Sequence, residues 1–309
     1  MTSAMTVGGV TLDILLPDGP QDRSGSIEKK DIPWIETAVG GGAANAATIL
    51  SKLGRQVAIH CAIGGDKEGH LLLQELKGRK INTDAVEVYR NHSTGLALIS
   101  VAHDGNVTVK AARGANLSFK GDGIDATTVA LMYITSSPEH VYARVHRRRA
   151  NDPDAIGFVA INPGMSQIVS NDIYTANLLK NADLLILNAA EARLHARKSR
   201  PGWDYENTMM CAKDIASKQS GVTCVTDGSN GAWLCDGDTL HFQPASSGAR
   251  QTEIGSMIGA GDTFGATLAH FLAAGIDLKH AAGLASQNAA ATIGDRDASS
   301  GAKPIADLL

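Results

Sequence analysis

Short apolar runs recur along this chain, and each of them ends in small or polar residues. Longer stretches with helix-compatible composition separate the runs. Short apolar runs in such a rhythm are typical of strands buried in a parallel sheet and joined by helices. The clearest runs are 131–134, 156–161, 184–187 and 222–226. This alternation restricts the chain to a parallel α/β architecture.

The N-terminal part of the chain fits the same pattern. Residues 7–14 predict a strand that opens the fold, and residues 43–53 predict a helix that ends at Gly54. The apolar run 57–63, bounded by Gly64 and Gly65, predicts a buried strand. A helix, a short loop and a buried strand in this order again indicate a parallel sheet.

The segment 94–112 has a different character. Two runs suited to strands, 96–101 and 107–109, flank Asp104-Gly105, a pair that favours a tight hairpin turn. Because hairpin strands are antiparallel, we expect this pair to stand outside the parallel sheet. Together with the polar stretch 16–34, it would form a small flap over one end of the main domain.

Charge and composition argue against several classes of protein. The chain has 28 Lys and Arg against 32 Asp and Glu, a net charge of -4, which gives no electrostatic reason to expect nucleic acid or a membrane surface as a partner. No window approaches the roughly 18 uncharged apolar residues of a membrane span, and no secretory signal is recognisable. The four cysteines form no CxxC pair, which favours buried thiols in a reducing cytoplasm.

Glycine is unusually frequent: the 33 glycines are about 11% of the chain, against a typical ~7%. One cluster, Gly259-Ala260-Gly261, precedes Asp262 and a helix-forming run. Small residues there leave backbone N–H groups free at a helix N-terminus, where they form an anion site. Asp262 alone would be explained as an N-terminal charge or cap. A phosphoryl group at this anion site would lie beside its carboxylate, as phosphoryl transfer to an alcohol requires.

A second glycine cluster, Gly40-Gly41-Gly42, precedes the predicted helix that contains Asn45. It is not a dinucleotide-binding fingerprint, because Asn45 stands where that motif has Gly or Ala, and the chain has no P-loop. Asn is a weak helix former, and Asn45 would be buried in an apolar helix. A buried polar group at a helix start suggests a hydroxylated ligand.

Two further motifs stand where predicted strands end. Asn188 and Glu191 form an NxxE pattern that, taken alone, is a variant of the capping box. The segment 226–231 either contacts nucleotide phosphates or is an ordinary hairpin loop. Since ligands of open α/β sheets bind at the carboxyl ends of strands, we expect chemistry at these endings and at 135–137 and 162–164.

Taken together and in this order, these residues resemble the ribokinase-like (phosphofructokinase B, PfkB) family of carbohydrate and nucleoside kinases. The resemblance rests on Gly41-Gly42-Ala43-Ala44-Asn45, on the NxxE motif and on Gly259-Ala260-Gly261-Asp262, and it covers nearly the whole chain. It implies a three-layer α/β fold with a central, mostly parallel sheet flanked by helices, plus a small β-sheet lid. Residues 1–309 would form one domain, with the lid built from about 14–36 and 92–114.

The resemblance also implies roles for the matching residues. Asp262 would be the base that deprotonates the substrate hydroxyl, and the amides of Gly259, Ala260 and Gly261 would form an anion hole. Substrate hydroxyls would be bound by Asp13, Gly41, Gly42 and Asn45. The ATP site would involve Asn188, Glu191, Thr226, Gly228, Gly231 and Asn288, with Glu191 acting on Mg²⁺ through water.

The implied function is ATP-dependent phosphorylation of a hydroxymethyl group on a small sugar or sugar derivative. A nucleoside (adenosine-like) kinase is one alternative, although the 4% aromatic content leaves few stacking partners, among them Trp34 and Phe119. A non-catalytic sugar-binding regulatory protein of the same fold is another, although such a protein would not need Asp262.

Three points stay open, two of them because this sequence departs from the family pattern. Ser256-Met257-Ile258 replaces the Asp-Thr-Thr of many members, so activation by K⁺ is open. Gly42 replaces the Lys of ribose-preferring members, which leaves the substrate open. Because lids in this family often pair, a homodimer through the lid is also open.

Overall fold

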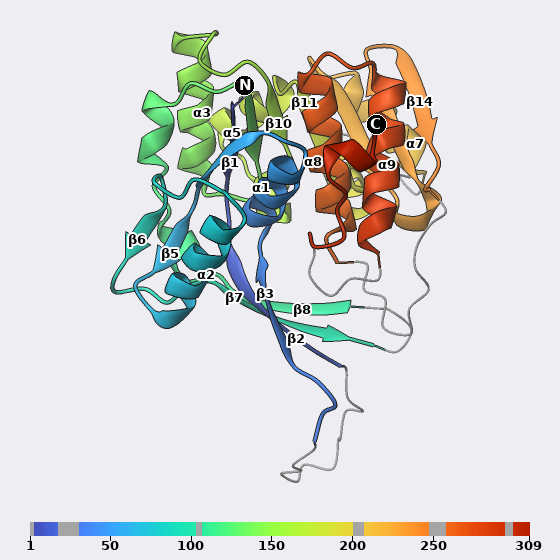
Figure 1. The fold of residues 1–309 in the computed structure, drawn as a ribbon. Coiled ribbons are helices and arrows are strands. Elements are labelled where there is room, and N and C mark those ends of the chain that lie inside the picture. Colours follow the sequence, from blue (N-terminus) through green and yellow to red (C-terminus); the bar gives the residue numbers. More distant parts are fainter. Residues whose placement is uncertain (1–2, 18–30, 103–106, 200–206, 247–257, 294–298) are drawn as a thin grey trace.

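The computed structural model describes residues 3–17, 31–102, 107–199, 207–246, 258–293 and 299–309. Its centre is an eight-stranded sheet with the strand order β14-β13-β12-β11-β10-β9-β1-β4 (Figure 1). The first six strands by sequence run parallel and the last two antiparallel, which confirms the predicted mostly parallel sheet. Their bounds are β1 Ser3–Val7, β4 Gln56–His60, β9 Leu131–Ile134, β10 Val159–Ile161, β11 Leu184–Asn188, β12 Val222–Thr226, β13 Ala232–Asp236 and β14 Thr239–Gln243.

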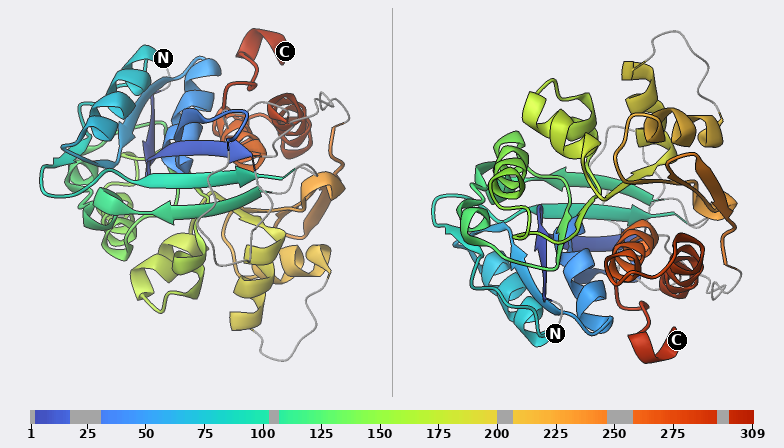
Figure 2. Two further views of the ribbon diagram at one scale, coloured as in Figure 1. Left: turned by 90° about the horizontal axis from the view of Figure 1, so that it is seen from below. Right: turned by 90° about the horizontal axis from the view of Figure 1, so that it is seen from above.

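Helices cover both faces of this sheet, as the resemblance implies (Figure 2). Side chains alternate along the strands, so that Leu131 and Tyr133 pack on one face and Met132 and Ile134 on the other. The first face is covered by α1 (Gly42–Lys52), α2 (Lys67–Gly78), α8 (Ala260–Ala273) and α9 (Leu278–Thr292). The second face is covered by α3 (Glu139–Asn151), α4 (Met165–Val169), α5 (Ile173–Lys180), α6 (Ala189–Ser199) and α7 (Thr208–Ala216).

Two of the predicted strands are wrong, because each proves to be two strands in different sheets. The segment 7–14 is divided between β1 and β2 (Thr11–Pro17), and the chain turns at Gly8, which has a φ of 142°. A side chain at Gly8 would collide with the Thr135 hydroxyl. The run 57–63 is divided between β4 and β5 (Ala62–Gly64), and β5 pairs with β6 (Glu87–Tyr89) instead. Both halves of each segment are largely buried, so hydrophobicity does not mark the change of sheet.

A separate four-stranded sheet has the order β3-β2-β7-β8, where β3 is Glu36–Gly40, β7 is Leu96–Val101 and β8 is Val107–Ala112. The antiparallel pairing of β7 with β8 confirms the predicted hairpin, whose Asp104-Gly105 turn lies outside the described residues. Leu15, Ala97, Ile99 and Val101 give this sheet a small core of its own. Seen from below, the sheet lies across one end of the larger domain (Figure 2, left).

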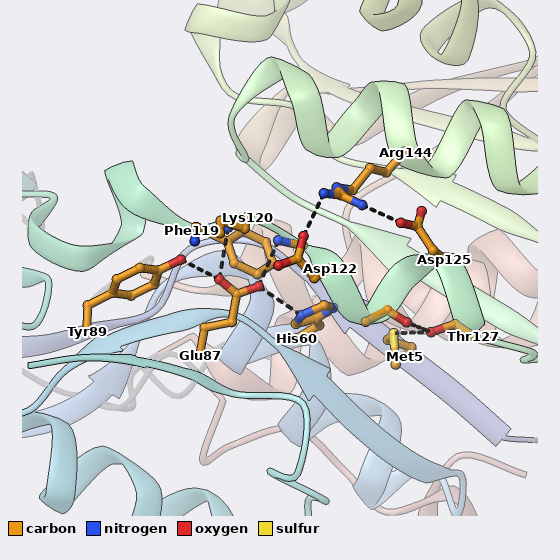
Figure 3. Close-up of polar contacts among 12 residues, drawn as sticks. Met5, His60, Glu87, Tyr89, Phe119, Lys120, Asp122, Asp125, Thr127 and Arg144 are labelled. Atoms are coloured by element: carbon orange, nitrogen blue, oxygen red, sulfur yellow. Dashed lines mark hydrogen bonds and ion pairs between the residues drawn. The ribbon is translucent and has the colours of Figure 1, made fainter.

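Glu87 ties the segment that follows the small sheet to the large sheet (Figure 3). Its carboxylate accepts hydrogen bonds from the Tyr89 hydroxyl at 2.7 Å and from the backbone N–H of Lys120 at 2.9 Å, and it lies 3.3 Å from His60 Nε2. Burial lowers the pKa of His60, so its imidazole is neutral near pH 7. The His60 carbonyl in turn accepts a hydrogen bond from the N–H of Gly8 at 3.1 Å. This cluster therefore fixes the loop that leads from β1 to the small sheet.

The described residues also bear on compartment and membrane association. All four cysteines are buried, as the sequence predicts. Burial raises the pKa of the Cys61 and Cys224 thiols, which keeps them protonated. Within the described ranges, no helix combines the length and apolar character that crossing a bilayer demands.

Candidate active site

A cavity of about 750 Å³ opens where β9 and β10 end. The predicted strand endings 135–137 and 162–164 both line it, at the carboxyl ends of strands where ligands of open α/β sheets bind. The cavity is also bounded by the β1–β2 loop, the start of α1, the end of β8 and the first turn of α8. The lining residues are Gly9, Thr11, Gly41, Gly42, Ala111, Arg113, Asn116, Leu117, 135–139, 162–164, Ser166, Gln167 and Asp262.

Asp262 reaches this cavity from the first turn of α8. Gly259 precedes the helix with a φ of 78°, a left-handed conformation that glycine adopts without strain. The first intrahelical bond runs from the Thr263 N–H to the Gly259 carbonyl at 2.8 Å. The N–H groups before Thr263 therefore have no partner within the helix, and they point toward its N-terminal side. Asp262 thus lies in the first turn of a helix that begins after Gly259, where the sequence predicts a helix N-terminus.

Asn45 holds the Asp262 carboxylate from the opposite helix. Its Nδ2 donates a 2.7 Å hydrogen bond to Asp262 Oδ2, although the two residues are 217 positions apart. The Asn45 side chain is buried, and its Oδ1 atom has no hydrogen-bond partner. A buried acceptor without a donor costs about 1–3 kcal/mol unless something satisfies it. Asn45 therefore orients Asp262 and keeps one acceptor for another donor.

Three acidic groups near this point have perturbed pKa values. Burial raises the pKa of Asp262, and the hydrogen bond from Asn45 opposes that change only in part. Burial also raises the pKa of Glu191, and the Asp262 charge adds to it. The same two causes raise the pKa of the Tyr133 hydroxyl. Groups perturbed by burial and by one another mark candidate catalytic sites.

The glycine turn before α1 requires residues without side chains. A Cβ atom at Gly40 would overlap the Asp13 carboxylate, and one at Gly41 would lie 2.5 Å from the Gly9 carbonyl oxygen. A Cβ at Gly42 would lie 3.0 Å from Thr135 Cγ2. Gly41 and Gly42 line the cavity, whereas Asp13 is buried next to it, where it accepts a 2.5 Å hydrogen bond from the Thr11 hydroxyl.

Asn188 and Glu191 lie at the end of β11 and the start of α6. The Asn188 N–H donates to Glu191 Oε2 at 3.0 Å, and the Glu191 N–H donates to Asn188 Oδ1 at 2.9 Å. This reciprocal pair is the capping box that the motif alone suggests. Asn188 is nevertheless exposed, and it pairs in register with Thr226 on β12. The two polar strand endings are therefore neighbours at one edge of the sheet.

The glycine-rich segment after Thr226 is the connection between two antiparallel strands. Gly231 has a φ of 103°, and a side chain there would collide with the Gln243 carbonyl. Gly228 has a φ of 55°, and no atom lies within 4 Å of where its Cβ would be. The hairpin interpretation of this segment is thus confirmed, and the open space at Gly228 remains compatible with a bound nucleotide.

Asn288, the last of the predicted nucleotide residues, lies in the interior of α9. Its side chain is fully buried in α9, where Nδ2 donates to Thr267 Oγ1 at 2.9 Å and Oδ1 accepts from the Lys303 N–H at 2.6 Å. The amide nitrogen therefore bonds α9 to α8, and the amide oxygen bonds α9 to the C-terminal segment. The family resemblance implies a place for Asn288 in the ATP site, and this geometry gives no support to it.

Arg113 and Asn116 line the cavity although no sequence motif pointed to them. Asn116 Oδ1 accepts from the Val10 N–H at 3.0 Å, and its Nδ2 donates to the Val10 carbonyl at 2.8 Å, which fixes the β1–β2 loop. Their position at the end of the predicted flap was the signal available. Phe119, a predicted stacking partner, is instead buried with its ring 5.0 Å from that of His60. Ser256 and Met257 lie outside the described residues.

Comparisons with known proteins agree with this fold. An "uncharacterized sugar kinase" from Archaeoglobus fulgidus is 26% identical over 237 residues, which is 74% of this chain and 88% of that protein. The structure of the Burkholderia thailandensis nucleoside kinase in complex with inosine superposes with a TM-score of 0.82 at 20% identity, covering 99% of this chain and 96% of the other. The Arabidopsis thaliana ribokinase complexed with ribose and ATP gives a TM-score of 0.81 at 19% identity, covering 99% and 97%.

The match to a family model extends over nearly the whole chain. The model of the pfkB family carbohydrate kinases matches residues 2–305. This range includes the glycine turn before α1, the capping box at β11 and the first turn of α8. The chain belongs to the pfkB family of carbohydrate kinases, which are phosphotransferases.

Proposed function

We propose that this protein transfers the γ-phosphoryl group of ATP to a hydroxymethyl group of a small sugar or sugar derivative. The observation that carries the proposal is the Asp262 carboxylate, which lines the cavity from the first turn of a helix. A base and a set of backbone donors in one place supply the two functions that phosphoryl transfer to an alcohol needs. The ribokinase with bound ribose and ATP supports the same pair of substrates for this fold.

In the proposed reaction, the acceptor hydroxyl gives its proton to Asp262 as its oxygen attacks the γ-phosphorus. The bond from the γ-phosphorus to the bridging oxygen breaks, and ADP leaves with the electron pair of that bond. The N–H groups of Gly259, Ala260 and Gly261 would hold the charge of the transferring group. Asn45 keeps Asp262 in place through their hydrogen bond.

The residues around Glu191 fit a Mg²⁺ ion that is bound mainly by phosphate and water. Burial raises the pKa of two carboxylates, Asp262 and Glu191, and a cation bound beside them would stabilise their charged forms. Among the described residues, no three His, Cys, Asp or Glu side chains gather into a metal site. Mg²⁺ commonly takes one or two carboxylates and completes its shell with phosphate and water. Glu191, through water, and Asn188 would hold the ion, which would neutralise charge on the ATP phosphates.

The small sheet would act as a lid over the acceptor. Gly9, Thr11, Ala111 and Arg113 reach the cavity from the ends of its strands or from the loop that enters it. A lid that excludes water limits the wasteful hydrolysis of ATP. Leu98 is an exposed apolar residue on the face of this sheet opposite its buried core, which supports pairing of two lids in a homodimer. The buried thiols and the use of ATP support a cytoplasmic location.

A sugar is a better acceptor for this cavity than a nucleoside. None of the described lining residues is aromatic, and nucleobases usually stack on aromatic side chains. Thr11 and Ser136 instead supply hydroxyl groups suited to sugar hydroxyls.

The test is a coupled assay of ADP release across pentoses, hexoses, ketoacid sugars and nucleosides, with and without K⁺. We expect at least one sugar or sugar derivative to drive ADP release with a higher kcat/KM than any nucleoside. A higher kcat/KM for a nucleoside than for any sugar would identify a nucleoside as the acceptor and contradict the proposal. Equal rates of ADP release with and without K⁺ would show that the segment replacing Asp-Thr-Thr does not bind an activating cation.

The pH profile of the reaction gives a second test. Because the pKa of Asp262 is raised, kcat/KM should fall as the pH drops through that value and recover above it. The acidic limb should therefore lie above the ~3.9 of an ordinary Asp. The residual activity of Asp262→Asn should lack this limb. A limb that is identical in both proteins would belong to another group.

A further inference from the structure

All four strands of the small sheet meet the larger domain at one edge. β2 and β7 run parallel to each other, and β3 and β8 run antiparallel to them. The starts of β2 and β7 therefore lie beside the ends of β3 and β8, and Leu12, Leu96 and Ala112 are in register there. In Figure 1 these strands extend together away from the helices. The position of the whole sheet thus depends on what fixes this edge.

The side chain of Asn116 joins two strands of this edge. Its Oδ1 accepts a hydrogen bond from the Val10 N–H at 3.0 Å. Its Nδ2 donates to the Val10 carbonyl at 2.8 Å and to the Arg113 carbonyl at 2.9 Å. Val10 is the residue before β2, and Arg113 is the residue after β8. One amide group therefore connects the chain that enters the sheet with the chain that leaves it.

Gly95, the residue before β7, lies against the same amide. Its carbonyl accepts a hydrogen bond from the Leu12 N–H at 2.9 Å. A Cβ atom at Gly95 would lie 2.4 Å from Asn116 Nδ2, 2.8 Å from the Val10 carbonyl oxygen and 3.2 Å from that of Arg113. The chain thus passes through the centre of this arrangement without a side chain. We call Val10, Gly95, Arg113 and Asn116 the lid joint.

The lid joint is anchored in the larger domain on two sides. The Val10 side chain is fully buried in the core between the large sheet and α1. Thr94, which precedes Gly95, donates its N–H to Asp66 Oδ2 at 2.7 Å, and its hydroxyl accepts from the Gly64 N–H at 3.0 Å. Asp66 is the N-cap residue of α2. The strands of the lid therefore start from fixed points.

Asn116 lines the acceptor cavity, but its amide has no hydrogen left for a sugar. An Asn side chain has two N–H donors, and here they go to the carbonyls of Val10 and Arg113. Arg113 also lines the cavity, as do Gly9 and Thr11 on either side of Val10. Asn116 therefore acts on the cavity through the positions of these neighbours.

We propose that Asn116 is a positioning residue that holds the lid and the β1–β2 loop in place over the acceptor. This inference rests on the proposed kinase function and adds a residue to it. The joint determines how well the sugar is bound and how well water is excluded from the γ-phosphate. Asp262 is held separately, by its hydrogen bond from Asn45, so the joint has less influence on the chemical step.

The Asn116→Ala variant tests this role through three kinetic quantities. Its KM for the sugar should rise about 10- to 100-fold, because small displacements of binding groups cost that much. Its kcat and its KM for ATP should change less than about threefold, on the scale of a surface contact. More ADP should be released for each sugar phosphorylated, because water reaches the γ-phosphate more often. Parallel assays of ADP and of sugar phosphate measure all three.

Asn207→Ala is the matched control for lost stability. Asn207 caps α7 and accepts hydrogen bonds from the N–H groups of Met209 and Met210 at 2.9 and 3.3 Å. It lies outside the cavity lining. Urea unfolding shows how much stability each variant loses. Asn207→Ala should keep the wild-type KM and the wild-type ratio of ADP to sugar phosphate.

Gly95→Ala disturbs the lid joint while Asn116 stays in place. It should raise the KM for the sugar and the ratio of ADP to sugar phosphate, as Asn116→Ala does. In the double variant the effects should combine to less than their product, because Asn116→Ala removes the atom nearest to the new Cβ. Independent effects that multiply fully would show that the two residues do not act as one joint, which overturns the inference.

Hydrogen exchange needs no substrate, so it separates the joint from the kinase function. Asn116→Ala should speed deuterium uptake about 5- to 10-fold in segments 8–13, 92–97 and 112–117, as expected for a lost hydrogen bond, and leave β10 and β11 unchanged. That result, with a wild type that phosphorylates none of the compounds, would confirm the joint and contradict the kinase function. Wild-type KM, ADP ratio and exchange in Asn116→Ala would contradict the joint and leave the kinase function standing. The same changes in Asn207→Ala would assign them to lost stability and also overturn the inference.

Discussion

The Asp262→Asn variant should release ADP about 10²- to 10⁴-fold more slowly than the wild type at saturating sugar, because a general base contributes a factor of that size. The amide cannot accept the proton of the acceptor hydroxyl, although it has nearly the same shape as the carboxylate. The loss should appear in kcat, since the proton moves only in the transition state. A coupled assay of ADP release with the sugar identified by screening measures it.

Two comparisons make this result specific. Asp236→Asn removes an equal charge from an exposed position at the end of β13 and should keep the wild-type rate. Sugar binding to Asp262→Asn, measured by calorimetry, should persist, because Asp262 supplies no cationic donor to the cavity. Unchanged turnover in Asp262→Asn would rule out its role as base. Loss of sugar binding along with turnover would instead assign Asp262 to substrate recognition.

The Gly41→Ala variant should lose about 2–5 kcal/mol of unfolding free energy. Part of this loss, about 1–2 kcal/mol, is the strain of an alanine at a φ of 87° and a ψ of 139°, a backbone conformation that side chains rarely adopt. The rest comes from the added Cβ, which would lie 2.5 Å from the Gly9 carbonyl oxygen and 2.7 Å from Val10 Cα. Backbone atoms cannot move aside as a flexible side chain can. Urea unfolding of both proteins measures the difference.

Gly237 offers a matched control for the backbone strain alone. It also has a positive φ, 55°, but no atom lies within 4 Å of where its Cβ would be. Gly237→Ala should therefore lose only about 1 kcal/mol and keep its activity. Equal losses of unfolding free energy in the two variants would show that a Cβ between the glycine turn and the β1–β2 loop costs no stability. Activity of Gly41→Ala should also fall, because Gly41 lines the cavity.

Much of the large sheet could be predicted from the sequence because its strands are buried on both faces. Runs such as 131–134 and 184–187 are continuous and apolar, and the structure places them in β9 and β11. The helix predicted at 43–53 is also confirmed, since small and apolar residues end there at a glycine with a left-handed backbone. The proposed base and the proposed anion site were recognisable for a similar local reason: Gly259, Gly261 and Asp262 lie within one helical turn.

The points that the sequence did not reveal depend on contacts between distant segments. The chain changes sheets at Gly8, and Thr135, far along the sequence, leaves no room for a side chain there. Asn288 resembles a ligand-binding residue in sequence, yet Thr267 and Lys303 use both ends of its amide. Arg113 carries no motif, and its place in the cavity follows from the path of the lid. Burial patterns do not encode such pairings.

The hydrogen bond between Asn45 and Asp262 has a consequence for how the protein is made. The partners are separated by 217 residues, which a ribosome adds in about 10–40 s at roughly 5–20 residues per second. During that interval α1 has been synthesised, while α8, against which it packs, has not. Incomplete chains therefore cannot transfer phosphate, and they expose the apolar surface of α1 that α8 later covers. Exposed apolar surface of this kind makes an incomplete chain prone to aggregation until α8 has been added.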